Sequence, residues 1–411
     1  MPLSTRVGSA RPTLKAGRRS LSVSPVAYLA AGLGVVGLVV GRSLGWVEFV
    51  AAGTLLLVLV VIAGLSTIGR SSYQVDLRLG EHNVKVGERA FGSIDVHNVG
   101  RRSVLPARIE LKVGRGRAEF ALPMLAPDAT HNELFAVPTT RRSVIGVGPV
   151  KSVRADALGL VRREVTWTDR EELFVHPRTV SLAGAAAGVI HDLEGQSRNT
   201  LSEDDMSFHA LREYVPGDDK RTIHWKSSAR ANKLMVRQFE DTRRTHTAVS
   251  LDVFGPHWDT EQSFELGVSV LASFGLQVLR DSMDASLFAG ARTLRTHSAR
   301  ALLDDSSRIE LPNDQGERPE PRNRRPQATD PASRIAMDAP TCSLAVVITG
   351  TTQSRAELSE VAKTLPVGAR ALFLLCEDGA ESVVASRGQV SFATLGALED
   401  LGRVLRMAVV A

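Results

Sequence analysis

The sequence predicts a multidomain protein that consists of a two-helix transmembrane hairpin, an antiparallel β-sandwich and an α/β domain with a mostly parallel sheet. Three patterns predict this fold class: two long apolar runs, a block of short alternating runs, and a later alternation of apolar strands with helices. We expect a basic cytoplasmic tail at residues 1–22, the hairpin at 23–69, the β-sandwich at 70–182, and a charged segment with the α/β domain at 183–411.

The N-terminal tail carries the whole excess charge of the chain. Lysine and arginine number 50 against 45 aspartate and glutamate residues, which gives a net charge of +5. The basic residues of the first 20 positions, which hold no acidic residue, are Arg6, Arg11, Lys15, Arg18 and Arg19. This charge favours an anionic membrane surface, and the balanced charge elsewhere argues against nucleic acid as a partner.

The two longest apolar runs lie at residues 26–41 and 46–69. At about 1.5 Å per residue the second run is long enough to cross a bilayer core of about 30 Å. The four-residue link RSLG forces the two helices to be antiparallel, and the preceding basic residues place both ends in the cytoplasm. We therefore expect a cell-membrane protein with two spans in the lipid bilayer and both termini cytoplasmic. A cleavable signal peptide is the alternative, but the second run directly behind favours the hairpin.

Short alternating runs fill the chain from about residue 73 to residue 182. Examples are YQVDLRL (73–79), GSIDVHNV (92–99) and ARIELKV (107–113). Turn residues separate runs at a spacing of roughly 8 to 12 residues, which is typical of an antiparallel β-sandwich.

Strands and helices alternate in the C-terminal part. THTAVSLDV (245–253) and SLAVVITG (343–350) are apolar strands, and residues 260–282 predict a helix that packs on a sheet. Ser354 and Glu357 have the spacing of a capping box at the start of a further helix. Continuous apolar strands between helices indicate a parallel sheet that is covered on both faces.

Residues 304–340 interrupt this pattern with 6 of the 18 prolines and many charges. This composition predicts a flexible insertion between strands of the α/β domain.

Cys342 and Cys376 lie in apolar runs without a CxxC partner or a metal-ligand pattern. They are typical of buried thiols in a reducing compartment, and nothing nearby would lower the pKa of either thiol for catalysis.

The segment REYVPGDDKRTIHWKSSARANKLMVRQFE (212–240) has seven basic and four acidic side chains around a Pro-Gly-Asp turn at 216–218. A short helix after the turn would present Arg221, Trp225 and Arg230 on one side. The forked guanidinium groups suit carboxylates, and the indole ring offers a flat surface for stacking. The donors are Arg212, Arg221 and Arg230, and the acceptors are Glu213, Asp218 and Glu240.

Three interpretations of this segment stay open. It is a salt-bridged clasp that pins the segment across the β-sandwich and the α/β domain, a docking surface for a protein partner, or a catalytic site. In the catalytic interpretation His209 or His224 acts as the base and Asp218 orients it. Ser227 and Ser228 lie inside the expected helix, which is a weak place for a nucleophile.

The stretches LREYVPGDDKRTIHWKSSAR (211–230) and NKLMVRQFE (232–240) resemble the signature of the DUF58 family, membrane-anchored bacterial proteins with a degenerate von Willebrand factor A-like domain. The resemblance covers roughly residues 70–295, and Leu211 stands where the signature has an arginine. It implies a von Willebrand A-like α/β domain and a MoxR-type AAA+ ATPase as a cytosolic partner. The signature residues, as a partner-binding or structural site, are Arg212, Tyr214, Pro216, Gly217, Asp218, Arg221, Trp225, Ala229, Arg230, Leu234 and Glu240.

Asp252 ends the first strand of the α/β domain, where ligands of such sheets bind. The resemblance places an Asp-x-Ser-x-Ser metal motif here, but Phe254 and Pro256 supply no side-chain oxygen. At the end of the later strand, Gly350 stands where the family fold often has an aspartate. Mg²⁺ needs about six oxygens, so Asp252 is only a weak metal candidate and we expect no cofactor. We expect its carboxylate to accept hydrogen bonds from the arginines of the signature or from a backbone N–H.

The function that these patterns favour is a membrane-tethered, non-enzymatic scaffold or adaptor that presents its α/β domain to a cytosolic partner. Two alternatives stay open. The first is a divalent-metal-dependent protein-binding module that uses Asp252. The second is a hydrolase that uses His209, His224 and Asp218.

Overall fold

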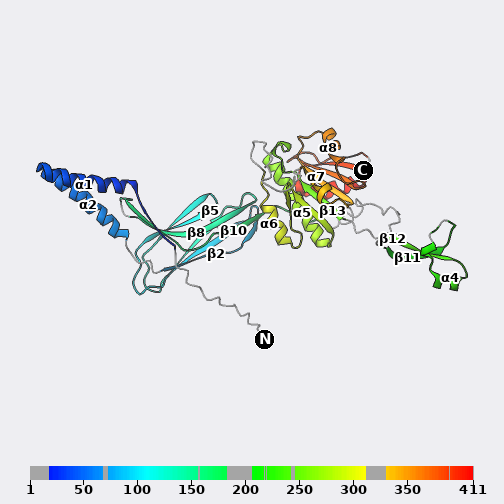
Figure 1. The fold of residues 1–411 in the computed structure, drawn as a ribbon, viewed down its shortest axis with the longest axis horizontal. Coiled ribbons are helices and arrows are strands. Elements are labelled where there is room, and N and C mark those ends of the chain that lie inside the picture. Colours follow the sequence, from blue (N-terminus) through cyan, green and yellow to red (C-terminus); the bar gives the residue numbers. More distant parts are fainter. Residues whose placement is uncertain are drawn as a thin grey trace, which may run out of the picture. The chain divides into compact units, whose positions relative to one another are not determined.

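The computed structural model describes residues 18–67, 73–155, 158–182, 206–216, 218, 220–241, 246–311, 330–387 and 389–410 (Figure 1). The chain divides into two compact units, residues 1–176 and 177–411. The first unit contains the two apolar helices and two β-sheets, and the second contains the α/β sheet and a separate β-hairpin.

Two antiparallel helices form near the N-terminus: α1 (Pro25–Leu44) and α2 (Val47–Thr67). Ser24 caps α1, because its hydroxyl accepts from the Val26 N–H and Pro25 supplies the fixed φ of the first helical position. Gly45 ends α1 in the left-handed region at φ 72°, which glycine adopts without a Cβ clash. The chain therefore reverses at residues 45 and 46, and α1 includes the first three residues of the predicted four-residue link.

Glycines let the two helices approach closely. A Cβ on Gly53 would lie 2.7 Å from the carbonyl oxygen of Gly34, and a Cβ on Gly41 would lie 2.7 Å from the backbone nitrogen of Val50. Small residues at such contacts are typical of helices that pack in a membrane.

The outer surface of this helix pair is apolar and exposed. Of the most apolar 18-residue window of each helix, only 17% of α1 and 11% of α2 is buried. Exposed side chains include Leu29, Leu33, Val39, Leu55 and Leu65. A core helix would bury such residues, so both helices are long and apolar enough to cross a membrane. Their orientation in a membrane stays a prediction.

The first unit contains two sheets. One has the order β1-β9-β8-β10-β3, with β5 on β8 and β6 on β5, and the other has the order β2-β4-β7. The strands of the first sheet are β1 (Arg18–Val23), β3 (Asn83–Lys85), β5 (Ala107–Val113), β6 (Gly116–Leu122), β8 (Ser143–Ala155), β9 (Val161–Thr166) and β10 (Glu171–His176). The strands of the second are β2 (Tyr73–Leu79), β4 (Ala90–Asn98) and β7 (Thr130–Val137).

Both sheets contribute to one hydrophobic core. Val75 and Ile94 from the smaller sheet pack with Leu111, Val147 and Leu173 from the larger one. In β4 every second residue is buried, which is the period of a strand with one face on a core. Adjacent strands are antiparallel except for β10 and β3, which pair in parallel.

The second unit holds a sheet in the order β15-β14-β13-β16-β17-β19-β18, in which the five central strands are parallel and the edge strands β15 and β18 pair antiparallel. Its strands are β13 (His246–Leu251), β14 (Asp284–Ala289), β15 (Arg292–Thr293), β16 (Leu344–Thr349), β17 (Arg370–Cys376), β18 (Val384–Arg387) and β19 (Val390–Leu395). This agrees with the mostly parallel sheet that the apolar runs predicted.

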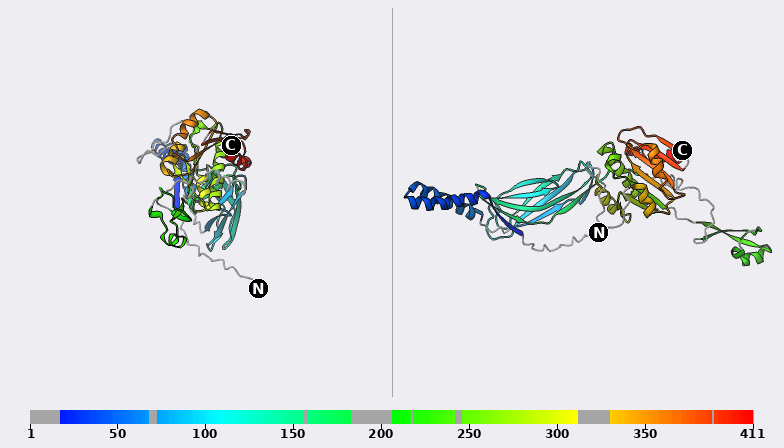
Figure 2. Two further views of the ribbon diagram at one scale, coloured as in Figure 1. Left: turned by 90° about the vertical axis from the view of Figure 1, so that its right-hand side faces the viewer. Right: turned by 45° about the horizontal axis from the view of Figure 1, so that its top comes forward.

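Helices cover both faces of this sheet, which Figure 2 shows from two directions. Alternate strand residues enter two separate cores, since Val346 packs with α5 (Glu261–Asp281), α6 (Ala299–Ser307) and α9 (Leu401–Val410). Val347 faces the other way, toward α7 (Pro331–Asp338) and α8 (Arg355–Ala362). Helix α8 begins with the predicted capping box of Ser354 and Glu357.

Both ends of the predicted flexible insertion at 304–340 are helical, which corrects the prediction for those residues. Helix α6 continues to Ser307, and α7 forms at residues 331–338 with Ala332 and Ile335 buried. Asp330 caps α7 by accepting from the Ser333 N–H. The two apolar residues three apart hold this helix on the sheet despite its charged neighbours. Residues 312–329 lie outside the described part of the chain.

Residues 206–241 form a hairpin of β11 (Met206–Glu213) and β12 (Met235–Asp241). Between the strands lie the short helix η1 (Lys220–Thr222) and helix α4 (Trp225–Ala231). Ile223 bridges back to Val236, and both side chains are buried. The signature segment, residues 211–240, is therefore built on this hairpin.

Candidate functional site

A bidentate ion pair closes the loop after β11. Arg212 Nη1 donates to Asp218 Oδ2 at 2.8 Å, and Arg212 Nη2 donates to Asp218 Oδ1 at 2.7 Å. The Val215 N–H also donates to Asp218 Oδ2 at 2.9 Å. The hydrogen bonds from Arg212 and then from Val215 hold the pKa of Asp218 below its ordinary value. The sequence predicted that forked arginines of this segment pair with its carboxylates without assigning partners, and Arg212 with Asp218 is one such pair.

The Pro-Gly-Asp stretch forms the expected turn, because the Asp218 N–H donates to the Val215 carbonyl at 3.0 Å. Pro216 is exposed, and Gly217 lies outside the described residues. Glu213 pairs with Lys233 instead of an arginine, at 3.3 Å. The side chain of Glu240 also lies outside the described part, so its predicted role as an acceptor stays a prediction.

The two serines at the start of α4 have structural partners. Ser227 Oγ lies 2.7 Å from His224 Nδ1, and the same nitrogen caps the helix by accepting from the Ser227 N–H. Ser228 is buried and accepts from the Met235 N–H at 2.8 Å, which ties α4 to β12. Among the described residues Asp218 bonds Arg212 and Val215, whereas His224 bonds Ser227, so the structure does not bring Asp218 and His224 together as the catalytic alternative required. The side chain of His209 lies outside the described residues.

Large apolar side chains of the signature segment remain exposed. Trp225 is 67% exposed, Val215 is 57% exposed and Leu234 is 44% exposed. The Leu234 carbonyl accepts from the Tyr214 N–H at 2.8 Å, which joins the two strands beside these residues. Ala229 and Arg230 are also exposed on α4, about one helical turn after Trp225.

The short helix that was predicted to carry Arg221, Trp225 and Arg230 together forms only in part. Trp225 and Arg230 belong to α4, whereas Arg221 belongs to the preceding η1. Within the described residues no guanidinium group stacks on the Trp225 ring, so its flat surface faces solvent. The short connection through Ile223 and His224 separates η1 from α4, which the spacing of the arginines alone did not reveal.

A second group of polar side chains surrounds Asp252, which is buried at 2% exposure. Its Oδ1 accepts from the Phe254 N–H at 2.9 Å, and its Oδ2 accepts from Thr349 Oγ1 at 2.9 Å. His257 Nδ1 lies 2.5 Å from the same Oδ2. The indole N–H of Trp258 donates to the Asp252 carbonyl.

The prediction that a signature arginine donates to the Asp252 carboxylate is wrong, whereas the prediction that a backbone N–H donates to it is confirmed. In the described part of the chain its carboxylate is held by Phe254, His257 and Thr349, with no signature arginine among its partners. The short helix η2 (Gly255–His257) after β13 turns His257 back over the strand end. Sequence reasoning missed His257. A polar residue within one turn of the strand end was the available signal.

The oxygen donors around Asp252 do not fit Mg²⁺. Both carboxylate oxygens already accept from protein donors, and no group of three or more His, Cys, Asp or Glu side chains gathers among the described residues. A Cβ at Gly350 would overlap the carbonyl oxygen of His257, so an aspartate has no space there. The η2 turn thus occupies the position at which a second acid would stand.

Comparison with known proteins gives a match to one family model and to one distant relative. Residues 210–283 match the family model described as "Protein of unknown function DUF58". The "Uncharacterized protein YeaD" of Bacillus subtilis (strain 168) is 31% identical over 134 residues, which cover 32% of this chain and 32% of that protein. The match therefore spans about a third of that relative's length.

Two solved structures resemble parts of the chain weakly. The CARDB domain of the PF1109 protein from Pyrococcus furiosus is 12% identical with a TM-score of 0.19, and the match covers 25% of this chain and 91% of that one. Spo0M, a sporulation control protein from Bacillus subtilis, is 16% identical with a TM-score of 0.17, covering 31% and 56% of the two chains. These scores are too low to establish a shared fold.

Proposed function

The chain carries a DUF58 family segment at residues 210–283, as the signature predicted, and from this premise we propose that it is a membrane-tethered scaffold or adaptor without enzymatic activity. Helices α1 and α2 anchor it in the cell membrane, and its second unit binds a cytosolic protein. The partner class that the family resemblance favours is a MoxR-type AAA+ ATPase.

The exposed indole of Trp225 supports this proposal most directly. Tryptophan and arginine dominate the energetic centres of protein interfaces, and α4 presents Trp225 and Arg230 within one short helix. Leaving such a ring 67% exposed loses the stabilisation that burial would give, and a partner that covers the ring recovers it. The exposed Val215 and Leu234 extend the apolar surface of the same segment.

The internal bonds of the signature segment support a preformed surface. The pair of Arg212 and Asp218 closes the loop before α4, and Ser228 ties α4 to β12. These contacts restrict the segment before any partner binds, so less conformational entropy is lost on binding. The Arg212–Asp218 pair thus holds the segment in place, and the exposed residues of the same segment contact the partner.

The proposal also assigns each unit a specific fold, a β-sandwich for the first and a von Willebrand A-like domain for the second. Two sheets that share one core support a β-sandwich in the first unit. A parallel sheet with helices on both faces supports a von Willebrand A-like domain in the second. The overlap at Gly350 and the bonded carboxylate of Asp252 support an A-like domain that works without a metal.

A binding measurement with the full-length chain in lipid nanodiscs tests the scaffold. The probe is a purified MoxR-type ATPase from the same source, added with ATP, with ADP or with EDTA. We expect binding that EDTA leaves unchanged in the absence of nucleotide and that Trp225→Ala weakens by about 2 kcal/mol or more, since interface centres contribute on that order. Charge reversal in Arg230→Glu should have a similar effect.

Met337→Ala is the matched control, because Met337 is an exposed apolar residue of α7 at 55% exposure. It should leave binding unchanged. Equal affinity of Trp225→Ala and the unaltered chain would contradict the proposed surface. Loss of binding in EDTA without nucleotide would favour a metal-dependent module instead.

A further inference from the structure

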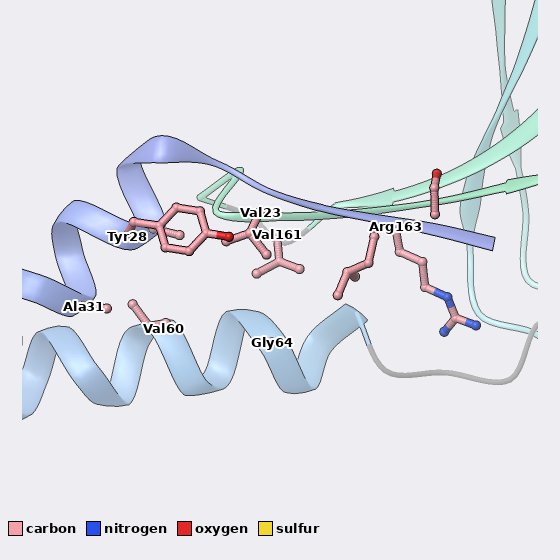
Figure 3. A pocket seen from close by; sticks show the side chains of 10 residues that line it. Val23, Tyr28, Ala31, Val60, Gly64, Val161 and Arg163 are labelled. Carbon is pink, nitrogen blue, oxygen red and sulfur yellow. The ribbon is translucent and has the colours of Figure 1, made fainter.

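A groove of about 640 Å³ lies in the first unit, where the two apolar helices meet the β1–β9 edge of the larger sheet (Figure 3). Tyr28 and Ala31 of α1 and Val60 and Gly64 of α2 form one end. Strands β1 and β9 form the other end, and both belong to the same compact unit as the helices.

The junction of strand and helix is structurally fixed. Strand β1 pairs antiparallel with β9, and the Ser24 N–H donates to the Leu160 carbonyl at 2.9 Å immediately before α1 begins. Ala27 and Ala63 of the helices pack with Val161 of β9 in a small buried cluster. The groove is therefore part of the fold and not a gap between independent pieces.

The groove changes from apolar to basic along its length. The register places Val23 opposite Val161 and Leu21 opposite Arg163, and alternate residues of a strand share a face. Moving away from the helices, the β1–β9 wall of the groove therefore presents Val23 beside Val161 first, and then Leu21 beside the guanidinium group of Arg163. The Arg163 side chain lines the groove at the end away from the helices (Figure 3).

This polarity matches the boundary of a bilayer. Ala31 lies six residues after the start of α1, about 9 Å of helix rise, so the apolar end reaches into the hydrocarbon layer of a spanning helix. Tyr28 is exposed in the first turn of α1, and tyrosine is enriched at the interface where a spanning helix enters the membrane. Arg163 lies at the other end of the groove, on the side that faces the headgroups when the helices span the membrane.

We propose that this groove binds one anionic glycerophospholipid of the surrounding leaflet, with an acyl chain along Ala31 and Val60 and its phosphate at Arg163. The inference rests on the proposed membrane tether. Continuity with the bilayer supplies the lipid, and the guanidinium group selects a headgroup with net negative charge. The bound lipid would fix the angle at which the sheet leaves the membrane.

Lipid retention by the full-length chain tests this site. The chain is reconstituted in vesicles of phosphatidylcholine and phosphatidylglycerol in equal amounts, its insertion is checked by flotation, and the lipids that survive extraction into mild detergent are counted by native mass spectrometry. We expect one retained phosphatidylglycerol per chain. Arg163→Gln should reduce the preference for phosphatidylglycerol by roughly fivefold, and Arg163→Lys should keep part of it.

Two glycines give a matched pair for the groove itself. A Cβ on Gly64 or on Gly32 meets no atom within 4 Å, but only Gly64 lines the groove. Gly64→Phe should abolish retention of the lipid, and Gly32→Phe should leave it unchanged. Inorganic phosphate in the buffer should not displace the lipid, because it cannot occupy the apolar end.

The outcomes separate the two proposals. A chain that fails to float with the vesicles overturns the membrane tether. A chain that floats but retains the same lipids in Gly64→Phe, or retains both lipids equally, overturns the groove alone. A retained second copy of the chain in place of a lipid also overturns it.

Discussion

Thr349 donates a hydrogen bond of 2.9 Å to the buried carboxylate of Asp252 across two neighbouring parallel strands, although the residues are 97 positions apart. The contact closes the carboxyl edge of the sheet between β13 and β16. His257 completes it from the η2 turn. The aspartate at the strand end is thus a buried polar junction that joins three segments of the α/β sheet.

We predict that Asp252→Asn destabilises the chain by about 1–3 kcal/mol, because the amide nitrogen would face donors in place of an acceptor. Urea unfolding of the full-length protein in detergent measures this change. Thr349→Val, which removes one donor from the same carboxylate, should cost less. Because both carboxylate oxygens already accept hydrogen bonds, Mg²⁺ should not raise the melting temperature. A Mg²⁺-dependent rise that disappears in Asp252→Asn would disprove this account.

We predict that Gly53→Leu disrupts the helix pair. The new side chain would occupy the position where a Cβ lies 2.7 Å from the Gly34 carbonyl oxygen, and overpacking of this kind costs about 1–3 kcal/mol. Unfolding in mixed micelles by increasing amounts of SDS would measure the loss. Gly32→Leu is the control, because a Cβ there has open space. Equal stability of the two variants would show that the close glycine contact is not needed.

We predict that the Arg212–Asp218 clasp opens in acid. The pKa of Asp218 lies below its ordinary value of 3.8, chiefly because of the hydrogen bonds from Arg212. A lowered folded-state pKa contributes stability that is present above pH 3.8 and is lost as the pH falls through the folded-state value. Hydrogen exchange of the Val215 N–H, corrected for intrinsic rates, should therefore accelerate only below that pH.

The control for this measurement is Asp218→Asn, which cannot ionise. Its exchange at Val215 should be faster at every pH and independent of acid. If the Val215 N–H of the unaltered chain stays protected from exchange well below pH 3.8, the Arg212–Asp218 contact does not depend on pH and the prediction is wrong.

We predict that both cysteines resist alkylation while the protein is folded. Burial raises the pKa of Cys342 to about 11 and raises the pKa of Cys376 as well. Since the thiolate is the reactive form, iodoacetamide at pH 8 should label neither thiol until denaturant is added. Mass spectrometry of peptic peptides reports the labelling. Rapid modification of Cys342 in the folded chain would show that it is accessible.

Much of the secondary structure followed from local patterns. The helices at 25–44 and 47–67 lie on the two apolar runs, and α8 starts at the predicted capping box. Helix α7 was missed, since Ala332 and Ile335 are too few to outweigh the proline and charge around them in the sequence. Local composition describes how a segment interacts with water, not which sheet lies beside it.

The signature segment shows the same division. Arg212 and Asp218 are six positions apart on either side of a turn that Pro216 favours, so the sequence could name both as a donor and an acceptor, although it did not assign them to each other. The partners of Asp252 could not be predicted, because Thr349 reaches it only through the register of β13 against β16. The expected arginines would have required a contact that no local rule determines.

The sequence by itself determined where the apolar helices lie, that the apolar runs around β13 and β16 form strands, and that residues 211–240 carry the charged signature, because each depends on periodicity or on residues a few positions apart. Only the tertiary structure decided that Asp252 bonds His257 and Thr349, that Gly350 leaves no space for a second acid, and that β1 continues a groove from the helices to Arg163. These contacts join residues that are distant in the chain. Strand register and the packing of whole elements fix them, and neither is encoded in any single stretch.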